Sequence, residues 1–164
     1  MGIGLESSPM VRSTPVTQAL DGLGIPYELH VHPGEVRSLE QAAEERGLDP
    51  SQIVRSLVFR SQDGSFVMVL MAGQGKVSWR KLRAHLGVSR LTTATPEEVR
   101  RVTGYEPGAV SPFGLLQVLR ILADRSVLDP QELSVGAGMR NAGVLLKRAD
   151  LIAALHPEIV DVRE

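Results

Sequence analysis

The chain contains 164 residues, of which 43% are hydrophobic and 23% are charged, and its formal net charge is −1. This length and composition predict one globular domain with its own core, and the near-neutral charge excludes a globally basic surface for binding nucleic acid. The sequence has no cysteine, which excludes a disulfide framework, a thiolate nucleophile and cysteine-ligated zinc, and which favours an intracellular protein.

Capping and breaker residues divide the first half of the chain into short helices and strands. Residues 1–14 lack hydrophobic periodicity and predict a flexible N-terminal segment, so the domain is expected over residues 15–164. Ser38 and Gln41 form a capping box at the start of one helix, and Gln62-Asp63-Gly64 is a hairpin signal between two β-prone runs. We expect that hairpin to be central. The expected elements are a helix over 16–23, a strand over 27–32, a helix over 39–46 and strands over 53–60 and 66–71.

The second half of the chain continues this irregular mixture. Ser78 caps one predicted helix, and Thr95 with Pro96 and Glu98 gives a stronger helix start. The expected elements are helices over 79–86 and 96–103, strands over 115–122, 132–135 and 143–146, and a helix over 148–155. Helices and strands that mix without a repeating βαβ unit predict an α+β fold.

Three glycines and two prolines occur between Thr103 and Gly114, and this composition excludes a regular helix or a central strand there. Glycine allows close backbone approach and proline fixes φ, so Gly108 to Pro112 predicts a rigid loop that presents backbone amides. Such loops hold anions or polarise carbonyl groups. An ordinary connecting turn is the alternative interpretation.

Other candidate sites have weaker support. His30 and His32 share one face of the predicted strand, but no nearby third ligand completes a metal site. Residues 136–141 are glycine-rich, yet they lack the last glycine of a dinucleotide motif, and no Gly-x-Ser-x-Gly elbow is present. A local basic patch or solvated helix faces would explain the cations Arg80, Lys81, Arg83, Arg100 and Arg101.

Six segments occur in an order that is typical of one family. They are residues 24–30, 47–50, 54–58, 103–114, 136–138 and 149–151. In this order they resemble the YbaK/EbsC family, which includes free-standing aminoacyl-tRNA deacylases and the editing insertion domain of bacterial prolyl-tRNA synthetases. The resemblance covers residues 16–162. It implies a single domain with a mixed, mostly antiparallel, barrel-like β core flanked by helices.

The resemblance implies hydrolysis of the ester that joins a wrongly chosen amino acid to the 3′-terminal adenosine of a tRNA. In this family the substrate's own ribose hydroxyl and the loop backbone assist water, so no side-chain general base, metal or other cofactor is implied. Negative charge develops on the ester carbonyl oxygen during the attack. The N–H groups of Gly108, Ala109 and Val110 are the expected donors that stabilise this charge.

The resemblance also implies a small pocket that selects the amino acid by size. Its expected walls are His32, Ser38, Ser56, Gly108 and Gly136. Neighbouring loop positions complete the expected substrate-binding set: Ala109, Val110, Ser111, Pro112, Ala137 and Gly138. Gly143 stands where some relatives carry a polar or acidic side chain.

Arg55 is the main departure from the family, because the family's characteristic lysine falls at this position. Arginine is a planar fork suited to phosphate or carboxylate, whereas lysine is a compact charge on a flexible stem. Arg55 is expected to act in catalysis together with Gly108, and Lys76 is a candidate to supply an amine in compensation. The alternatives are a catalytically weakened module that binds tRNA or a synthetase, and a pocket for free aminoacyl nucleotides or small ligands.

The resemblance implies further properties of the whole protein. Its expected partner is the 3′ acceptor end of a mischarged tRNA, and a synthetase partner and a homodimer are both left open. No apolar run approaches the roughly 20 residues that cross a bilayer, and the first residues do not resemble a secretory leader. A soluble, cytoplasmic protein without membrane contact is therefore expected.

Overall fold

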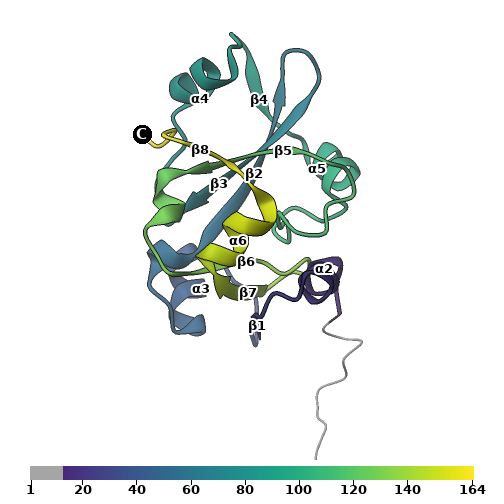
Figure 1. The fold of residues 1–164 in the computed structure, drawn as a ribbon, viewed down its shortest axis with the longest axis vertical. Helices are drawn as coiled ribbons and strands as arrows, with labels where there is room; N and C mark the ends of the chain where they lie inside the picture. The colour runs from purple at the N-terminus through teal and green to yellow at the C-terminus, as the bar shows by residue number, and fades with distance from the viewer. Residues whose placement is uncertain (1–12) are drawn as a thin grey trace, which may run out of the picture.

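The computed structural model describes residues 13–164, which form two β-sheets with helices packed around them (Figure 1). The helices are α2 (Pro15–Leu23), α3 (Leu39–Arg46), α4 (Trp79–Leu86), α5 (Pro96–Thr103) and α6 (Arg148–Leu155). The strands are β1 (Glu28–Val31), β2 (Val54–Ser61), β3 (Phe66–Ala72), β4 (Leu91–Thr93), β5 (Arg120–Asp124), β6 (Glu132–Gly136), β7 (Ala142–Lys147) and β8 (Glu158–Val160). None of the described helices is long and apolar enough to cross a membrane.

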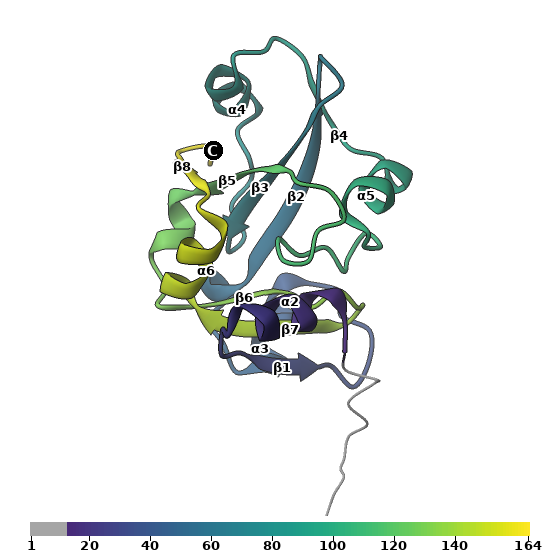
Figure 2. The same ribbon diagram turned by 45° about the vertical axis from the view of Figure 1, so that its right-hand side comes forward.

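The two sheets differ in size and in strand direction. The smaller sheet has the order β1-β7-β6 and is antiparallel, whereas the larger has the order β4-β2-β3-β5-β8, with β5 parallel to both of its neighbours. Figure 2 shows the smaller sheet, with α2 and α3 beside it, below the β2–β3 hairpin. An isolated parallel bridge between Ile53 and Ser134 connects the sheets. The expected α+β class and central hairpin are confirmed, but the two sheets do not close into a barrel.

Local capping signals place the helices. The side chains of Ser38, Ser78 and Thr95 accept hydrogen bonds from the backbone N–H three residues later, at 3.0, 3.2 and 3.1 Å respectively. Each bond satisfies one of the N–H groups that the first turn of a helix leaves without a partner. The three helix starts predicted from these residues therefore agree with the structure.

The N-terminal boundary of the domain lies slightly earlier than predicted. The flexible segment expected over residues 1–14 falls outside the described residues except for Ser13 and Thr14. Thr14 is buried, accepts the N–H of Thr17 at 3.2 Å and donates its hydroxyl to the carbonyl oxygen of Ala137 at 2.6 Å. Thr14 therefore belongs to the folded domain.

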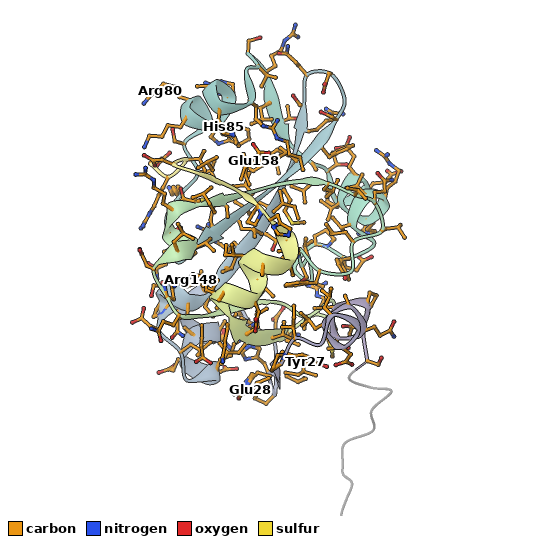
Figure 3. All side chains as sticks on the ribbon, viewed as in Figure 1. Tyr27, Glu28, Arg80, His85, Arg148 and Glu158 are labelled. Atoms are coloured by element: carbon orange, nitrogen blue, oxygen red, sulfur yellow. The ribbon has the colours of Figure 1, made fainter. Side chains whose placement is uncertain are left out.

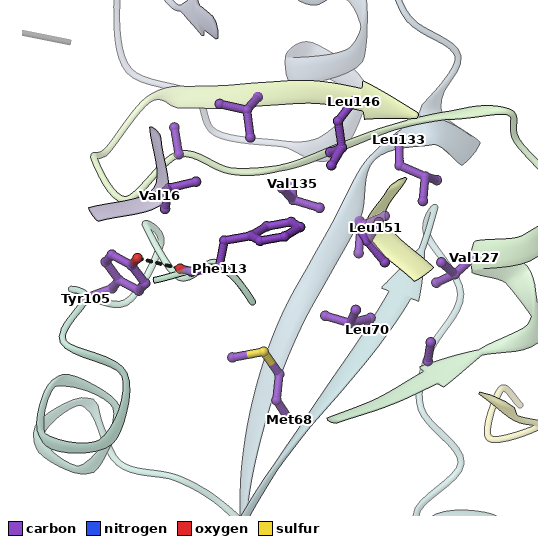
Figure 4. Close-up of a cluster of buried hydrophobic side chains, with 14 of the residues drawn as sticks. Val16, Met68, Leu70, Tyr105, Phe113, Val127, Leu133, Val135, Leu146 and Leu151 are labelled. Carbon is purple, nitrogen blue, oxygen red and sulfur yellow. Dashed lines mark hydrogen bonds between the residues drawn. The ribbon is translucent and has the colours of Figure 1, made fainter. Parts of the chain in front are cut away.

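The main hydrophobic core lies between the sheets, and a smaller one lies between the larger sheet and α4. Met68 and Leu70 of β3 face the main core, while Val69 and Met71 face the smaller one. Figure 4 shows the main core, where Phe113 packs among side chains of both sheets. Phe113 belongs to the long loop, residues 104–119, which connects α5 to β5. β3 is buried on both faces, which explains its uninterrupted apolar sequence.

The strand predicted over 115–122 is shorter in the structure, because β5 begins only at Arg120. The N–H groups of Leu116 and Gln117 donate instead to the carbonyl oxygens of Thr103 and Val102, at 3.1 and 3.3 Å. The carbonyl groups at the end of α5 therefore accept the hydrogen bonds that a neighbouring strand would otherwise accept. Leu116 and Val118 are exposed, so this run is not buried although its composition is apolar.

The Tyr105 hydroxyl closes the long loop by donating to the carbonyl oxygen of Phe113 at 2.6 Å (Figure 4). The ring is 3% exposed, and burial raises the pKa of Tyr105 to about 12. We predict that Tyr105→Phe lowers the free energy of unfolding by about 1–3 kcal/mol, because the buried carbonyl loses its partner. Urea denaturation measures this change. Tyr27→Phe, at a partly exposed ring, is the control with a smaller expected effect; equal losses in both variants would contradict the prediction.

Ion pairs join Glu158 of β8 to Arg120 of β5 and to His85 of α4. Figure 3 labels His85 and Glu158. The guanidinium of Arg120 donates to both Glu158 oxygens, at 2.6 and 2.8 Å, and His85 lies 3.2 Å from Glu158. The hydrogen bonds from Arg120 lower the pKa of Glu158 to about 2. This stabilisation is complete above the unfolded-state pKa of about 4.3 and is lost as the pH falls toward 2.

We therefore predict that Glu158→Gln flattens the loss of stability between pH 4.5 and pH 2. The effect is modest, because the pair is about half exposed to solvent. Thermal unfolding measured across this range, with Glu35→Gln as the control at another exposed arginine pair, tests the prediction. An acid limb of unchanged steepness in Glu158→Gln would contradict it.

Candidate functional site

A cavity of about 300 Å³ lies between the first half of β2, the long loop and the smaller sheet. Five of the residues predicted for the site line it: Arg55, Ser56, Gly108, Val110 and Gly136. The remaining lining residues were not predicted: Arg46, Ile53, Val54, Leu57, Val135 and Ala142. The structure therefore brings together residues that are up to 96 positions apart in the sequence, from Arg46 to Ala142.

One wall of this cavity is an open strand edge. β3 pairs with β2 from Val54 to Arg60, whereas β4 covers the opposite edge of β2 only from Phe59 to Ser61. No described strand covers that second edge between residues 54 and 57, which is the segment that lines the cavity. The buried hydroxyl of Ser56 also has no hydrogen-bond partner among the described residues. A ligand could satisfy these groups.

A tight turn shapes the opposite wall. The N–H of Ala109 donates to the carbonyl oxygen of Glu106 at 2.9 Å, with Pro107 and Gly108 at the two central positions. The φ angle of Gly108 is +92°, which suits the second central position of a type II turn and disfavours any residue with a side chain. A Cβ at this position would meet no atom within 4 Å, so the glycine borders open space.

The turn limits which loop amides are free to bind a ligand. Ala109 is 3% exposed and already donates within the turn. Among the described residues, no acceptor contacts the N–H groups of Gly108 and Val110, and both residues line the cavity. Ser111 and Pro112 are buried behind the turn, and the Ser111 hydroxyl accepts the N–H of Phe113 at 3.3 Å. Two of the three amides expected to stabilise an oxyanion therefore remain available.

Arg55 projects between this cavity and a neighbouring one. One of its terminal nitrogens donates to the carbonyl oxygen of Gly75, while its Nε is buried and has no partner among the described residues. Burial lowers the pKa of Arg55, and the nearby charge of Arg163 lowers it further. The structure thus holds a partly desolvated guanidinium, with a free donor, at the border of the cavity.

A second guanidinium at the cavity was not predicted. Arg46 donates its Nε to Nε2 of His32 at 2.9 Å and one terminal nitrogen to the Ser134 hydroxyl at 2.7 Å. The Nδ1 atom of His32 lies 2.7 Å from Glu45, whose pKa is lowered by hydrogen bonds from Gln41 and His32. Because Nε2 accepts from Arg46, Nδ1 carries the proton and donates to Glu45. His32 therefore orients Arg46 from behind the cavity wall.

Sequence reasoning missed Arg46 because it stands in the last turn of α3, where a cation ordinarily interacts with the helix dipole and solvent. Its partners lie 14 and 88 residues away. The even spacing of His30 and His32 did place them on one face, with ring centroids 4.7 Å apart. The spacing of these two histidines was the one sequence signal that side chains pack together on this face of the strand.

Four other predicted residues lie outside the lining of this cavity. Ser38 is exposed and caps α3, and Lys76 lines the neighbouring cavity. The carbonyl oxygen of Ala137 accepts the Thr14 hydroxyl, while Gly138 has a φ of +81° beside Tyr105. In the structure these last two residues support the fold behind the cavity.

The fold agrees with comparisons to known proteins. Residues 33–154 match the model of the aminoacyl-tRNA editing domain, and the chain belongs to this family. The family expected from the sequence is thereby confirmed.

Relatives occur both inside larger enzymes and as separate proteins. The chain is 34% identical to the proline–tRNA ligase of Trichlorobacter lovleyi over 122 residues, which are 74% of this chain but 21% of that enzyme. It is 33% identical to the uncharacterized protein YwhH of Bacillus subtilis over 70% of this chain and 72% of that protein. A proposed trans-editing enzyme for prolyl tRNA synthetase has a similar crystal structure, with a TM-score of 0.86 and 30% identity, covering 97% of this chain and 99% of that one.

Gly136 allows the loop to approach β6. A Cβ at this position would collide with the carbonyl group of Val110 and lie 3.4 Å from the carbonyl oxygen of Ala109. We predict that Gly136→Ala lowers the free energy of unfolding by about 1–3 kcal/mol, because backbone rather than a flexible side chain must move.

Gly22→Ala is the matched control for this prediction. A Cβ at Gly22 in α2 meets nothing within 4 Å, so this change should stabilise the protein by about 0.5–1 kcal/mol. Chemical denaturation of both variants measures the two opposite shifts. A Gly136→Ala protein as stable as the wild type would mean that the loop does not depend on this close approach.

Proposed function

We propose that this protein hydrolyses the ester between an amino acid and the 3′ end of a mischarged tRNA, as a cytoplasmic enzyme that acts in trans. The observation that carries the proposal is the cavity between an open strand edge and two free loop amides. The family and the similarity to a proposed trans-editing enzyme support it. Because the chain spans about a fifth of the proline–tRNA ligases that it matches, the activity of those whole enzymes is not carried over.

The chemistry of the described lining suits ester hydrolysis without a side-chain base. The lining contains two guanidinium groups but no carboxylate, imidazole or thiol. In the proposed reaction, water adds to the ester carbonyl carbon and negative charge collects on the carbonyl oxygen. The N–H groups of Gly108 and Val110 stabilise this oxygen. The bond to the ribose oxygen then breaks, and that oxygen takes one proton of the attacking water. The amino acid leaves as a carboxylate, and the second proton of the water is released to solvent.

The size of the cavity favours a small amino acid. A volume of about 300 Å³ is at the lower end of the range for small-molecule sites. Steric exclusion rejects larger side chains more strongly than a pocket can reject one missing methylene. Because several relatives are proline–tRNA ligases, mischarged tRNA for proline is the first substrate to test.

The alternative is a module that binds tRNA or a synthetase without catalysis. The observation in its favour is that Arg55 donates to the Gly75 carbonyl, so part of its guanidinium is directed away from the loop amides. The family's lysine would place its whole charge at one point. Deacylation assays on a panel of mischarged tRNAs distinguish the two functions. Tight tRNA binding with no turnover at high enzyme concentration would favour the module.

Variants of Arg55 test its place in the reaction. We predict that Arg55→Ala lowers kcat/KM for deacylation by about 10- to 100-fold, as expected for loss of a charged hydrogen bond. Arg55→Lys should retain more activity than Arg55→Ala, because it keeps the positive charge. Arg37→Ala, at an exposed arginine away from the cavity, is the control and should leave turnover unchanged. Equal activity of Arg55→Ala and wild type would remove Arg55 from the site.

A further inference from the structure

A second cavity, of about 320 Å³, adjoins the first. Arg55 and Leu57 line both cavities, so the two share a wall at β2. The floor of the second cavity is apolar and aromatic, and includes Phe59, Val77 and Trp79. The mechanism proposed above uses none of these three side chains.

Trp79 is the most unusual residue of this cavity. It is the single tryptophan of the chain, and it is 37% exposed although it stands at the start of α4 beside the smaller core. Its ring packs edge-to-face against the buried ring of Phe59, with centroids 5.2 Å apart and an interplanar angle of 89°. This contact holds the indole in place and leaves part of its surface open to the cavity.

Cationic side chains lie in and beside the lining of the second cavity. Lys76 lines the cavity, is exposed and forms no ion pair among the described residues. Arg55 donates to the Gly75 carbonyl, and the Arg163 guanidinium lies so close to Gly75 that a Cβ there would collide with it. Glu164 is the one acidic residue in the described lining. The described lining therefore carries two cationic side chains, Arg55 and Lys76, and one acidic side chain.

We propose that this second cavity binds an unpaired nucleotide of the tRNA acceptor end, next to the nucleotide that carries the ester. A base stacks on Trp79, and its phosphate lies against Lys76 and Arg55. Proteins bind single-stranded nucleic acid in this way, through an aromatic platform within a positively charged groove. The inference rests on the proposed function for its choice of ligand. The first cavity would hold the amino acid, and the second would hold the nucleotide that precedes the one carrying the ester. The two ligand groups would lie on opposite sides of Leu57.

The single tryptophan gives a direct binding signal. An RNA tetranucleotide that ends in CCA and carries no amino acid should quench the intrinsic fluorescence of the full chain in a saturable way, because the stacked base contacts the indole. Salt should weaken this binding, because phosphate contacts release counterions. A titration without any change of fluorescence, at concentrations where anisotropy of a labelled copy shows binding, would place the RNA elsewhere and overturn the proposal.

Variants separate stacking from charge. Trp79→Ala should weaken binding of the labelled tetranucleotide by about 5- to 150-fold, and Trp79→Phe by less, because the phenyl ring still stacks. Lys76→Gln should weaken binding and reduce its salt dependence. Arg80→Gln removes the same charge from an exposed residue of α4 outside the described lining and is the matched control. Thermal unfolding of each variant checks the fold, and Trp79→Phe keeps the test valid if Trp79→Ala is unstable.

Failure of this inference differs from failure of the proposed function. If mischarged tRNA is hydrolysed but Trp79→Phe, Trp79→Ala and Lys76→Gln all bind the tetranucleotide like the wild type, the subsite is wrong and the deacylase function remains. If the tetranucleotide binds and quenches Trp79 but no mischarged tRNA is hydrolysed, the subsite remains and catalysis is wrong. Neither result depends on the other assay.

Discussion

A backbone contact between the long loop and the smaller sheet is the constraint on which the site depends. Gly136 has no side chain, so the carbonyl group of Val110 can approach β6 more closely than any Cβ would allow. This approach places Phe113 in the main core and the turn at Gly108 on the cavity. Burial of Phe113 then holds the loop in place, and the Tyr105 hydroxyl closes it from the other end. The same contact between the loop and β6 therefore fixes both the packing of Phe113 in the core and the position of the Gly108 turn at the cavity.

The second requirement is that one edge of β2 stays uncovered. Exposed strand edges invite pairing with other chains, and proteins usually cover, shorten or charge them. Here the open edge from Val54 to Leu57 lines a cavity between the loop and the smaller sheet, so its backbone groups face a space of the size that binds small molecules. β4 is only three residues long and covers the rest of that edge. Its shortness thus creates the site.

The parts of the fold that depend on neighbouring residues could be predicted, and those that depend on distant contacts could not. Ser38 and Thr95 cap helices through residues three positions away, and both helix starts agree with the prediction. β4 and β8 are too short to show alternation, and the contact of Leu116 with Thr103 depends on how α5 ends. In the site, Gly108 was predicted from turn composition and family resemblance. Arg46 was not predicted, because its role depends on Ser134, 88 residues away.

Arg55 connects the two cavities, and its geometry gives the replacement of lysine a physical meaning. A lysine carries its charge at one atom, whereas the guanidinium spreads its donors over a plane. In this chain one donor is fixed on the Gly75 carbonyl and Nε has no partner at the border of the first cavity. The same side chain can therefore contact a phosphate in one cavity and a ribose or ester oxygen in the other. Arginine at this position would link recognition of the nucleotide to placement of the ester through donors on separate nitrogens, whereas the three donors of an ammonium share one nitrogen.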